Sequence, residues 1–253
     1  MKIVVVGGTG LIGSSTVTQL RAAGHTTLPA SPSSGVDTVT GDGVRDAIAG
    51  ADVVIDTTNA PSWQDAEVMN FFLASTQHLL DAEVDAGVTH HIALSVVGAE
   101  RMLASGYFRA KIVQESLIRS GPIPHTIVRA TQFFEFIPSI ADSATTADTI
   151  RLPAAAIRPI AASDVSTHLA RTATSAPTNG VIEVAGPDTY RLDDVVRRVL
   201  EAHDDTRRVI TDPSAPYYGW VHLDDTTLLP AEDTAVGSTH LTDWLTRRPA
   251  TPR

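Results

Sequence analysis

The sequence predicts a doubly wound α/β fold, in which helices cover both faces of a parallel sheet, with a smaller C-terminal lobe attached. Three observations predict it. Short apolar segments alternate with amphipathic segments of helical length through the first half of the chain, as in proteins whose parallel strands are joined by crossover helices. A glycine-rich turn, GGTGLIG, separates the first apolar segment from the first amphipathic one. The 253 residues, 43% of them hydrophobic, are enough to bury the core of such a sheet.

The strands and helices of the first half are placed by hydrophobic pattern and by glycine. Lys2–Val6 is a run rich in β-branched residues, which suits a strand buried on both faces. The first helix closes at Gly24 and the longest at Gly87, because glycine commonly ends helices. A strand is also expected within residues 36–42. The remaining strands are predicted at residues 25–28, 52–55, 91–95 and 125–128, and the helices at 14–23, 44–49, 62–86 and 106–119.

The alternation of strands and helices loosens after Arg129. We divide the chain there into a lobe of residues 1–130 and a C-terminal lobe of residues 131–253, packed together as one structural unit. A helix in the second lobe is expected to be capped by Ser163 or Asp164. A short helix that carries aromatic residues is expected within residues 130–142. Two extended segments are expected within residues 151–164, before the capped helix. A strand, a turn and a helix are expected within residues 181–203.

The composition excludes several classes of function. The chain has 29 acidic and 19 basic residues, a net charge of −10, and no Lys/Arg cluster longer than a pair, which argues against nucleic-acid binding. It contains no cysteine and hence no disulfide framework or thiolate metal site. No apolar run approaches the roughly 18 residues of a spanning helix, and the N-terminus leads into the glycine turn rather than a cleavage site. We therefore expect a cytoplasmic protein that acts on a small molecule without a membrane partner. A homodimer is a possible assembly, since dimers are the commonest soluble oligomers.

The glycine turn has the spacing of a phosphate-binding loop. Gly7, Gly8, Gly10 and Gly13 satisfy both G-x-G-x-x-G and G-x-x-G-x-x-G. Glycines allow the backbone to turn tightly and to approach a pyrophosphate, whose charge then lies at a helix N-terminus. Because the turn follows a predicted strand and opens a predicted helix, residues 1–130 are predicted to bind a dinucleotide.

The segment after the second strand bears on which dinucleotide binds. NAD-binding proteins usually place Asp or Glu there to bind the ribose 2′-hydroxyl, whereas this sequence has no carboxylate between Pro29 and Ser34. The hydroxyls of Ser31 and Ser33 are available to donate to a 2′-phosphate, although the usual Arg is missing. The sequence thus favours NADP(H), with NAD(H) as the alternative. Asp42 either contacts the adenine or caps the next helix.

Ser95, Tyr107 and Lys111 form the predicted catalytic group. Ser95 ends a strand, while Tyr107 and Lys111 lie four residues apart on one helical face, where the ammonium charge is expected to lower the pKa of the phenol. Such a Tyr can exchange a proton with an alcohol oxygen as hydride moves, and Ser95 can hold that oxygen. Lys111, one of two lysines in the chain, is also expected to bind the nicotinamide ribose. The alternative interpretation is an ordinary surface pair of Tyr and Lys.

Two further groups of residues are not assigned to the site. His90 and His91 are adjacent and therefore point to opposite faces of a strand, and the other histidines lack the spacing of metal ligands, so no metal is expected. Tyr217, Tyr218 and Trp220 follow a proline-containing turn and are interpreted either as a lid or as an oligomer contact.

Several segments resemble a known family. GGTGLIG, LSVVGAE with Ser95, and YFRAK with Tyr107 and Lys111 resemble the short-chain dehydrogenase/reductase superfamily. VVIDTTNAPSW, HHIALSVVG, HTIVRATQFFEF and IRPIAASDV resemble its atypical, NmrA-like branch of NAD(P)-binding proteins, over residues 1–186. The resemblance implies a Rossmann fold, binding of NADP(H) or NAD(H), and reduction of quinones, carbonyls or flavin-like acceptors.

The resemblance also implies roles for particular residues. Residues 129–133 would close over the nicotinamide. Along the pyrophosphate and the adenosine side, the cofactor would be lined by Thr9, Leu11, Ile12, Thr58 and Asn59. At the nicotinamide end the resemblance implies a cofactor contact from Arg129 and a substrate pocket walled by Gln132, Phe133, Phe134 and Phe136. The three Phe residues also suit a hydrophobic core.

Comparison with the family leaves alternatives open. Many NmrA-like members lack the catalytic Tyr and act as redox sensors, whereas this sequence has Tyr107, which favours an enzyme. In the related isoflavone-reductase-like branch a Lys near this position acts as the base, so Lys111 is the alternative proton-transfer group. The leading hypothesis is an NAD(P)H-dependent oxidoreductase that transfers hydride to a carbonyl or quinone. The alternatives are a non-catalytic NADP(H) sensor and an NAD-dependent epimerase or dehydratase.

Overall fold

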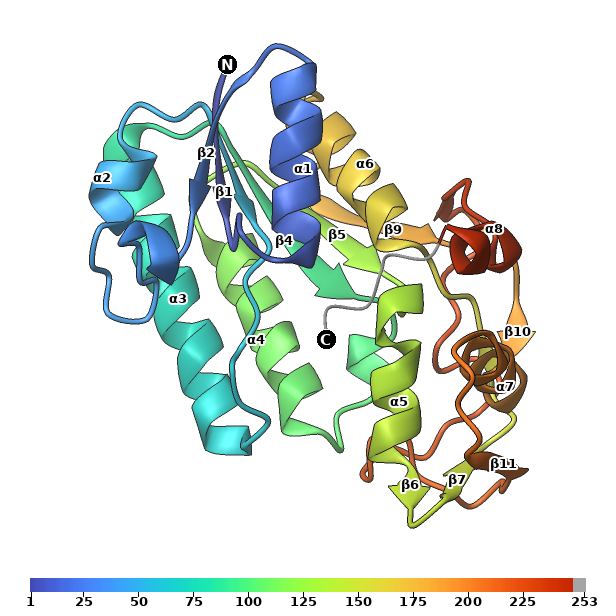
Figure 1. Ribbon diagram of the computed structural model, residues 1–253. Coiled ribbons are helices and arrows are strands. Elements are labelled where there is room, and N and C mark those ends of the chain that lie inside the picture. Colours follow the sequence, from blue (N-terminus) through green and yellow to red (C-terminus); the bar gives the residue numbers. More distant parts are fainter. Residues whose placement is uncertain (248–253) are drawn as a thin grey trace.

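The computed structural model describes residues 1–247, and its centre is a parallel sheet of seven strands (Figure 1). The strands lie in the order β12–β9–β5–β4–β3–β1–β2, and each neighbouring pair is parallel. The predicted parallel sheet is therefore confirmed. The bounds of the strands are Lys2–Val6 for β1, Thr26–Ala30 for β2, Val53–Asp56 for β3, His90–Val96 for β4, His125–Ala130 for β5, Gly180–Ala185 for β9 and Ala235–Val236 for β12.

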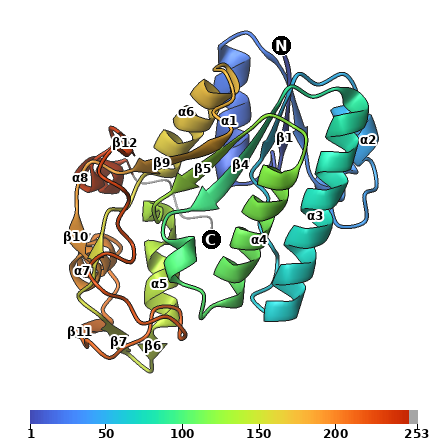
Figure 2. The ribbon, with the colours of Figure 1, turned by 180° about the vertical axis from the view of Figure 1, so that it is seen from behind.

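Helices cover both faces of this sheet, as Figures 1 and 2 show from opposite sides. In β1, Ile3 and Val5 pack against one helical layer and Val4 and Val6 against the other, which is why this strand is apolar along its length. Residues 1–247 hold no helix whose length and apolar character suffice for a membrane span. The first layer consists of α1 (Leu11–Ala22) and α6 (Ala162–Ala173), and the second of α2 (Val44–Ile48), α3 (Asp65–Ala86) and α4 (Gly106–Ser120).

The strand expected within residues 36–42 is wrong, because this segment is a series of turns. The Oδ1 atom of Asp37 accepts hydrogen bonds from the backbone N–H groups of Val39 and Thr40, at 2.8 and 3.3 Å. Gly41 and Gly43 then adopt φ angles of 85° and 70°, which lie outside the strand region. As a result β2 is an edge strand of the sheet.

The expected cap of α6 by Ser163 or Asp164 is also wrong. The helix begins at Ala162, so both residues lie inside its first turn, and the N-cap residue is Ala161, whose methyl group cannot accept a hydrogen bond. The carboxylate of Asp164 instead accepts hydrogen bonds from the backbone N–H and the hydroxyl of Thr239, at 2.8 and 3.0 Å. Asp164 thereby ties α6 to the C-terminal part of the chain.

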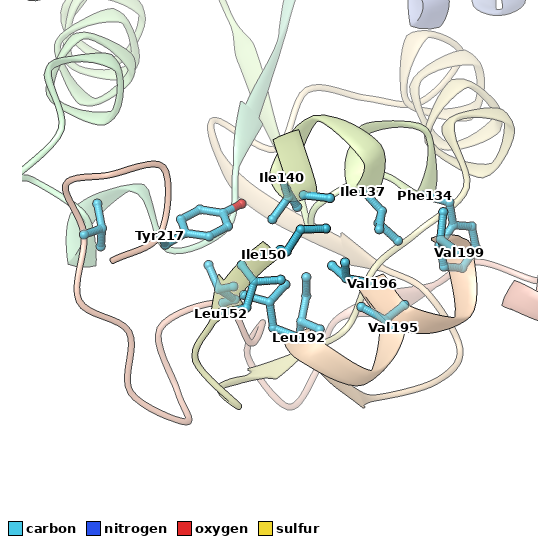
Figure 3. Close-up of a cluster of buried hydrophobic side chains, with 14 of the residues drawn as sticks. Phe134, Ile137, Ile140, Ile150, Leu152, Leu192, Val195, Val196, Val199 and Tyr217 are labelled. Carbon is cyan, nitrogen blue, oxygen red and sulfur yellow. The ribbon is translucent and has the colours of Figure 1, made fainter. Parts of the chain in front are cut away.

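Residues after 130 build a smaller lobe and also complete the central sheet. The core of the smaller lobe contains the side chains of Ile140, Ile150 and Leu192, with the ring of Tyr217 beside them (Figure 3). Meanwhile α6, β9 and β12 belong to the central sheet and its helical cover, and the division of the chain at residue 130 stays a prediction. The remaining elements are α5 (Ile137–Ser143), α7 (Leu192–Ala202), α8 (Leu241–Thr246), β6 (Thr145–Thr146), β7 (Thr149–Leu152), β8 (Ala156–Ile157), β10 (Tyr190–Arg191), β11 (Arg208–Thr211) and the 3₁₀ turns Pro32–Ser34, Ala99–Arg101 and Phe134–Phe136.

The order of the strands reverses at β1, whose neighbours are β2 and β3. From β1 the chain first runs outward to β2 and then returns to β3 on the other side of β1. In open α/β sheets, ligands bind in the crevice at the carboxyl ends of the strands at such a reversal. The fold therefore places the candidate site just after Val6 and Asp56, which end β1 and β3.

Candidate active site

A cleft of about 1210 Å³ opens at the carboxyl ends of β1, β3, β4 and β5. It extends from the glycine turn after β1 to a mouth lined by aromatic side chains of both lobes. Among the residues in 1–247 that line it, Lys111 is the one basic residue, whereas Asp37, Asp65 and Asp142 are acidic. Arg109 pairs with Asp65 and Arg207 with Asp142 from outside the lining, so the charges of these two carboxylates are largely balanced, and Lys111 is the cation at the floor of the described lining.

The turn after β1 accommodates glycine alone at three positions. Gly7 has a φ angle of 74°, and a Cβ atom there would lie 2.9 Å from the backbone of Thr57. At Gly8 a Cβ atom would lie 2.6 Å from the carbonyl oxygen of Val5, and at Gly13 it would lie 2.3 Å from that of Gly7. Because these distances are shorter than the contacts that Cβ atoms make in proteins, the turn depends on the absence of side chains.

Helix α1 begins beside the cleft, with Gly10 as its N-cap residue. Its first turn holds no acidic residue, and no side chain of residues 1–247 caps it. The N–H groups and the dipole at such a helix end attract anions. Of the residues expected at the pyrophosphate, the cleft lining within residues 1–247 includes Gly7, Thr9, Gly10, Leu11, Ile12 and Gly13, but not Gly8.

The end of the cleft beyond β2 differs from the sequence-based expectation. Within residues 1–247 its lining includes Ser31 but neither Ser33 nor Asp42. The hydroxyl oxygen of Ser33 lies 2.8 Å from that of Ser31, and the exposed carboxylate of Asp42 accepts a hydrogen bond from the Thr40 hydroxyl at 2.9 Å. Asp37 lines the cleft instead. Sequence reasoning missed this carboxylate because it placed Asp37 in a strand.

Several buried polar atoms beside the cleft have no hydrogen-bond partner within residues 1–247. They are Oγ1 of Thr58, Oγ1 of Thr131, and Oε1 and Nε2 of Gln132. All three residues line the cleft, as does Asn59. Because buried polar atoms are normally paired, a bound ligand rich in hydroxyl, amide and phosphate groups would supply the missing partners. Together with the space left by the glycines, these atoms fit a dinucleotide.

Ser95, Tyr107 and Lys111 all line the cleft, but their polar groups have different surroundings. The hydroxyl of Ser95 donates to Oε1 of Glu115 at 2.7 Å. Its one hydrogen is thus already used, and Ser95 can offer a ligand only its oxygen lone pairs.

Tyr107 lies in an aromatic group rather than in a polar one. The centroid of its ring lies 5.3 Å from the ring centroid of Trp63, 6.1 Å from that of Phe72 and 5.3 Å from that of Phe108. Burial, together with the neighbouring phenol of Tyr218, raises the pKa of Tyr107. The expectation that its pKa is lowered is therefore wrong, because desolvation of the phenolate dominates.

Lys111 is buried at the floor of the cleft, with 2% of its surface exposed. Its Nζ atom donates to the carbonyl oxygen of Leu94 at 2.9 Å and to the side chain of Gln114, and it lies 4.6 Å from the centroid of the Phe72 ring. Burial lowers the pKa of Lys111 to about 8, against the opposing attraction of Asp56. An amine with this pKa exists in both protonation states near neutral pH and can exchange a proton.

Arg129 belongs to an ion network, and the cleft lining within residues 1–247 does not include it. Its guanidinium binds both carboxylate oxygens of Glu115, at 2.8 and 2.7 Å, and a carboxylate oxygen of Glu100 at 2.9 Å. Although burial acts in the opposite direction, the hydrogen bonds from Arg129 and Ser95 hold the pKa of Glu115 below its usual range. The structure therefore does not bring Arg129 together with the other residues expected at the cofactor.

The phenylalanines expected in the substrate pocket divide between the cleft and the core. Phe133 and Phe136 line the cleft beside Gln132, with their ring centroids 5.4 Å apart and 26° between the planes. Phe134 is 1% exposed and packs against Trp244 at 5.5 Å between centroids, so it is a core residue. The sequence did not distinguish these positions because all three lie in one short aromatic segment.

Aromatic residues that sequence reasoning left unassigned line the outer part of the cleft, where Trp63 and Trp220 are exposed and Tyr217 is buried at the edge of the core of the smaller lobe. They come from the segment between β3 and α3 and from the loop after β11, and they are Trp63, Tyr217, Tyr218 and Trp220. The rings of Trp63 and Tyr218 stack on each other across the mouth. In the sequence, the turn before Tyr217, Tyr218 and Trp220 could have indicated that these residues belong to the site. No feature of the sequence indicated the same for Trp63.

Comparisons with known proteins agree with this geometry. Residues 7–149 match the model of a protein family described as NAD(P)H-binding. No curated protein matches the sequence.

Solved structures with the same fold share little sequence with this chain. A short-chain dehydrogenase/reductase superfamily protein from Agrobacterium tumefaciens with bound NAD is 16% identical, with a TM-score of 0.74 over 98% of this chain and 95% of that one. dTDP-4-dehydrorhamnose reductase from Bacillus anthracis, in complex with NADP, is 10% identical, with a TM-score of 0.69 over 96% and 92%. UDP-glucose 4-epimerase from Thermus thermophilus, in complex with NAD, is 17% identical, with a TM-score of 0.69 over 88% and 89%. At these identities the likeness establishes the fold.

Proposed function

This chain belongs to the NAD(P)H-binding family, and we propose from that premise that it is an oxidoreductase that reduces an uncharged, planar carbonyl or quinone compound with NAD(P)H. The observation that carries the proposal is the ammonium group of Lys111, which is the one cation that residues 1–247 contribute to the lining of a cleft whose mouth is aromatic. Its pKa of about 8 allows it to give a proton at neutral pH.

The glycine turn and the polar residues beside it would hold the cofactor. The glycine turn and the first turn of α1 fit the pyrophosphate, whose charge is favoured at a helix N-terminus. Ser31, Thr58 and Asn59 line the same side of the site and offer hydroxyl and amide groups to the nucleoside. When bound, the reduced cofactor supplies a hydride ion to the acceptor.

Lys111 would supply the proton that completes the reduction. As the carbonyl carbon accepts the hydride, the electron pair of the C=O π bond moves to the oxygen. An Nζ–H bond of Lys111 then breaks and an O–H bond forms, and the amine regains its proton from water. Rings such as Trp63 and Phe133 are suited to stack on a planar acceptor and to exclude water from it.

The charge of the cleft favours an uncharged acceptor. A nucleotide sugar carries a diphosphate, which proteins commonly bind with Arg or Lys. The lining within residues 1–247 contains no Arg, and its one Lys, Lys111, already donates to Leu94 and Gln114. The aromatic side chains at the mouth instead favour contact with a planar ring.

The carboxylate of Asp37 supports NAD(H) as the preferred cofactor, the second of the two that the sequence allows. Asp37 lines the cleft near Ser31, beyond the end of β2, where the ribose 2′ position lies in this fold class. A 2′-phosphate there would face a negative charge, and no Lys or Arg of residues 1–247 lines that end to offset the repulsion.

The proposed function is tested by binding and turnover together. Thermal unfolding with NADH or NADPH measures binding, and NADH oxidation is then followed with a naphthoquinone, an aromatic aldehyde and a nucleoside-diphosphate 4-keto sugar as acceptors. We expect turnover with the first or second, and its loss in Lys111→Met with NADH binding retained. Turnover with the 4-keto sugar nucleotide alone, or full activity of Lys111→Met, would contradict the proposal.

A non-catalytic dinucleotide sensor is the second candidate, and the hydrogen bond from Ser95 to Glu115 favours it. The hydroxyl that would orient a substrate oxygen is engaged inside the protein at 2.7 Å. Under this alternative NADH or NADPH stabilises the fold, yet no acceptor is turned over. Any acceptor-dependent NADH oxidation that disappears in Lys111→Met would reject it.

A further inference from the structure

Gln114 links the cation of the cleft to a buried carboxylate. It lies three residues after Lys111 on α4, so the two side chains share one face of the helix. Both residues are 2% exposed. The Nζ atom of Lys111 donates to Oε1 of Gln114, and Nε2 of Gln114 donates to Oδ2 of Asp56 at 2.9 Å.

The far end of this chain of hydrogen bonds is fixed by the backbone. Asp56, the last residue of β3, is 1% exposed, and its Oδ1 atom accepts the backbone N–H of Thr58 at 2.8 Å. Thr58 in turn lines the cleft. The carboxylate is therefore held in place by two donors, one from the backbone after β3 and the other from Gln114.

We propose that Gln114 is a positioning residue that fixes the ammonium group of Lys111 in the cleft and couples it to the buried charge of Asp56. The proposal deepens the proposed function, because it rests on Lys111 as the proton donor, and it assigns the control of that donor to a residue outside the predicted Ser, Tyr and Lys group.

An amide is the side chain that suits this position. Lys111 only donates hydrogen bonds and an ionised Asp56 only accepts them, so the residue between them needs an acceptor at one end and a donor at the other. A carboxylate at position 114 would face the carboxylate of Asp56. An apolar side chain would remove a donor from Asp56 and an acceptor from Lys111, leaving buried polar groups with fewer partners.

The other described groups around Lys111 do not connect it to Asp56. From β4 the carbonyl of Leu94 accepts a second N–H at 2.9 Å, and from α3 the ring of Phe72 lies under the ammonium. On α4 the nearest carboxylate, Glu115, is already bound to Ser95, Arg119 and Arg129. Tyr107, one turn earlier, turns its ring to other aromatic residues. Asp56 is thus the carboxylate that hydrogen bonds connect to Lys111 through one intervening side chain, that of Gln114.

The chain offers an unusually direct measurement, because it has only two lysines, Lys2 and Lys111. In a Lys2→Arg background, protein labelled with ¹³C-lysine gives one side-chain Cε resonance, whose shift is followed against pH without cofactor or acceptor. Gln114→Met and Gln114→Glu are compared in this background. Gln77→Met, an exposed substitution on α3, is the matched control.

We expect the titration midpoint of Lys111 to fall in Gln114→Met, which loses a hydrogen bond to the charged form, and to rise in Gln114→Glu, which adds a negative charge, each by about one pH unit. Gln77→Met should leave it unchanged. If Gln114→Met does not fold, the near-isosteric Gln114→Glu decides alone. A midpoint that stays at the wild-type value in a folded Gln114 variant would overturn the proposal, since a merely structural glutamine would change only the unfolding temperature.

The same variants separate this inference from the proposed function. If Lys111 is the proton donor, the pH profile of NADH oxidation shifts in step with the resonance. If the resonance shifts while the pH profile does not, Gln114 still positions Lys111, and the assignment of the proton donor is the part that fails.

Discussion

Trp63 and Tyr218 stack on each other at the mouth of the cleft, with ring centroids 6.1 Å apart and 18° between the planes. Trp63 lies between β3 and α3, and Tyr218 lies in the loop after β11 of the smaller lobe. Tyr218 adopts a φ angle of 48° and Gly219 one of 78°, so this loop turns sharply where it presents the ring. Each lobe therefore contributes one ring to the closure of the cleft.

Replacing Trp63 should weaken the binding of an aromatic acceptor and leave cofactor binding intact. Trp63 is 67% exposed, so its removal disturbs little of the core. For Trp63→Ala we expect KM for the acceptor to rise about tenfold, which corresponds to the loss of one ring stacking contact. Steady-state kinetics at saturating NADH measure this, and Trp63→Phe is the control that keeps a ring. An unchanged KM in Trp63→Ala would show that the acceptor binds elsewhere.

Gly13 should be essential to dinucleotide binding. A Cβ atom at this position would lie 2.3 Å from the carbonyl oxygen of Gly7, so Gly13→Ala must displace the turn and should cost about 1–3 kcal/mol of stability. We expect the rise in unfolding temperature caused by NADH to disappear. In the control Gly180→Ala, the new Cβ atom would lie 3.8 Å from its nearest neighbour, the carbonyl oxygen of Thr178. This variant should therefore keep the rise in unfolding temperature with NADH. A wild-type thermal shift in Gly13→Ala would mean that the cofactor binds away from the turn.

The charge of Asp37 should set the preference between the two cofactors. Asp37→Asn keeps the side-chain oxygen that accepts the N–H groups of Val39 and Thr40, while it removes the negative charge. We expect the ratio of the Kd for NADPH to the Kd for NADH to fall about fivefold, as expected for one unfavourable charge interaction of about 1 kcal/mol. Titration calorimetry measures both constants. Asp42→Asn, outside the cleft lining within residues 1–247, should leave the ratio unchanged.

The parts of the molecule that could be predicted are those fixed by local sequence. The strand Lys2–Val6 and the glycine turn were predicted because burial on both faces and a tight turn restrict the residue types directly. The turns at 36–42 were not, because the side chain of Asp37 captures backbone N–H groups that a strand would have used.

The surroundings of a residue in the site were harder to predict than its position. Ser95 and Lys111 do line the cleft, yet Glu115, the partner of Ser95, comes from the helix packed on its strand, and Gln114, which Lys111 contacts on the same helix, reaches Asp56 of β3. Arg129 was expected at the cofactor, and Glu115 holds it in an ion network instead. Partners of this kind leave no pattern in a single sequence, because they depend on the distance between layers.

The pH dependence of turnover should report the charge of Lys111. The donor must be protonated, so kcat/KM should be level below the pKa of about 8 and fall about tenfold for each pH unit above it. Tyr107→Phe should keep this profile, because burial raises the pKa of Tyr107 and the profile of the wild-type enzyme should owe nothing to it. A profile that is level through pH 9 in the wild type, or that changes in Tyr107→Phe, would assign the proton to another group.

A buried ion pair at the opposite end of the sheet should make stability depend on pH. Nδ1 of His91 lies 2.8 Å from Oε1 of Glu83, and both side chains are fully buried. Burial alone would lower the pKa of His91, but the charge and hydrogen bond of Glu83 outweigh it and raise the pKa above 6.5. The folded state therefore binds this proton more tightly than the unfolded state does. The stability that the pair contributes is complete below pH 6.5 and is lost as the pH rises through the folded-state pKa.

Glu83→Gln should remove this dependence, because the amide keeps the shape of the side chain and loses its charge. We expect it to cost about 3 kcal/mol of unfolding free energy at pH 6, and less as the pH rises. Urea unfolding of wild type and variant at several pH values measures the difference, in which the contributions of His90 and His125 largely cancel. Asp188→Asn removes the charge from the exposed pair of Asp188 and His240 and should leave the free energy of unfolding nearly unchanged at any pH, because water screens exposed pairs. If the difference between wild type and Glu83→Gln grew with rising pH, His91 would be neutral in the folded protein and the buried pair would not be ionic.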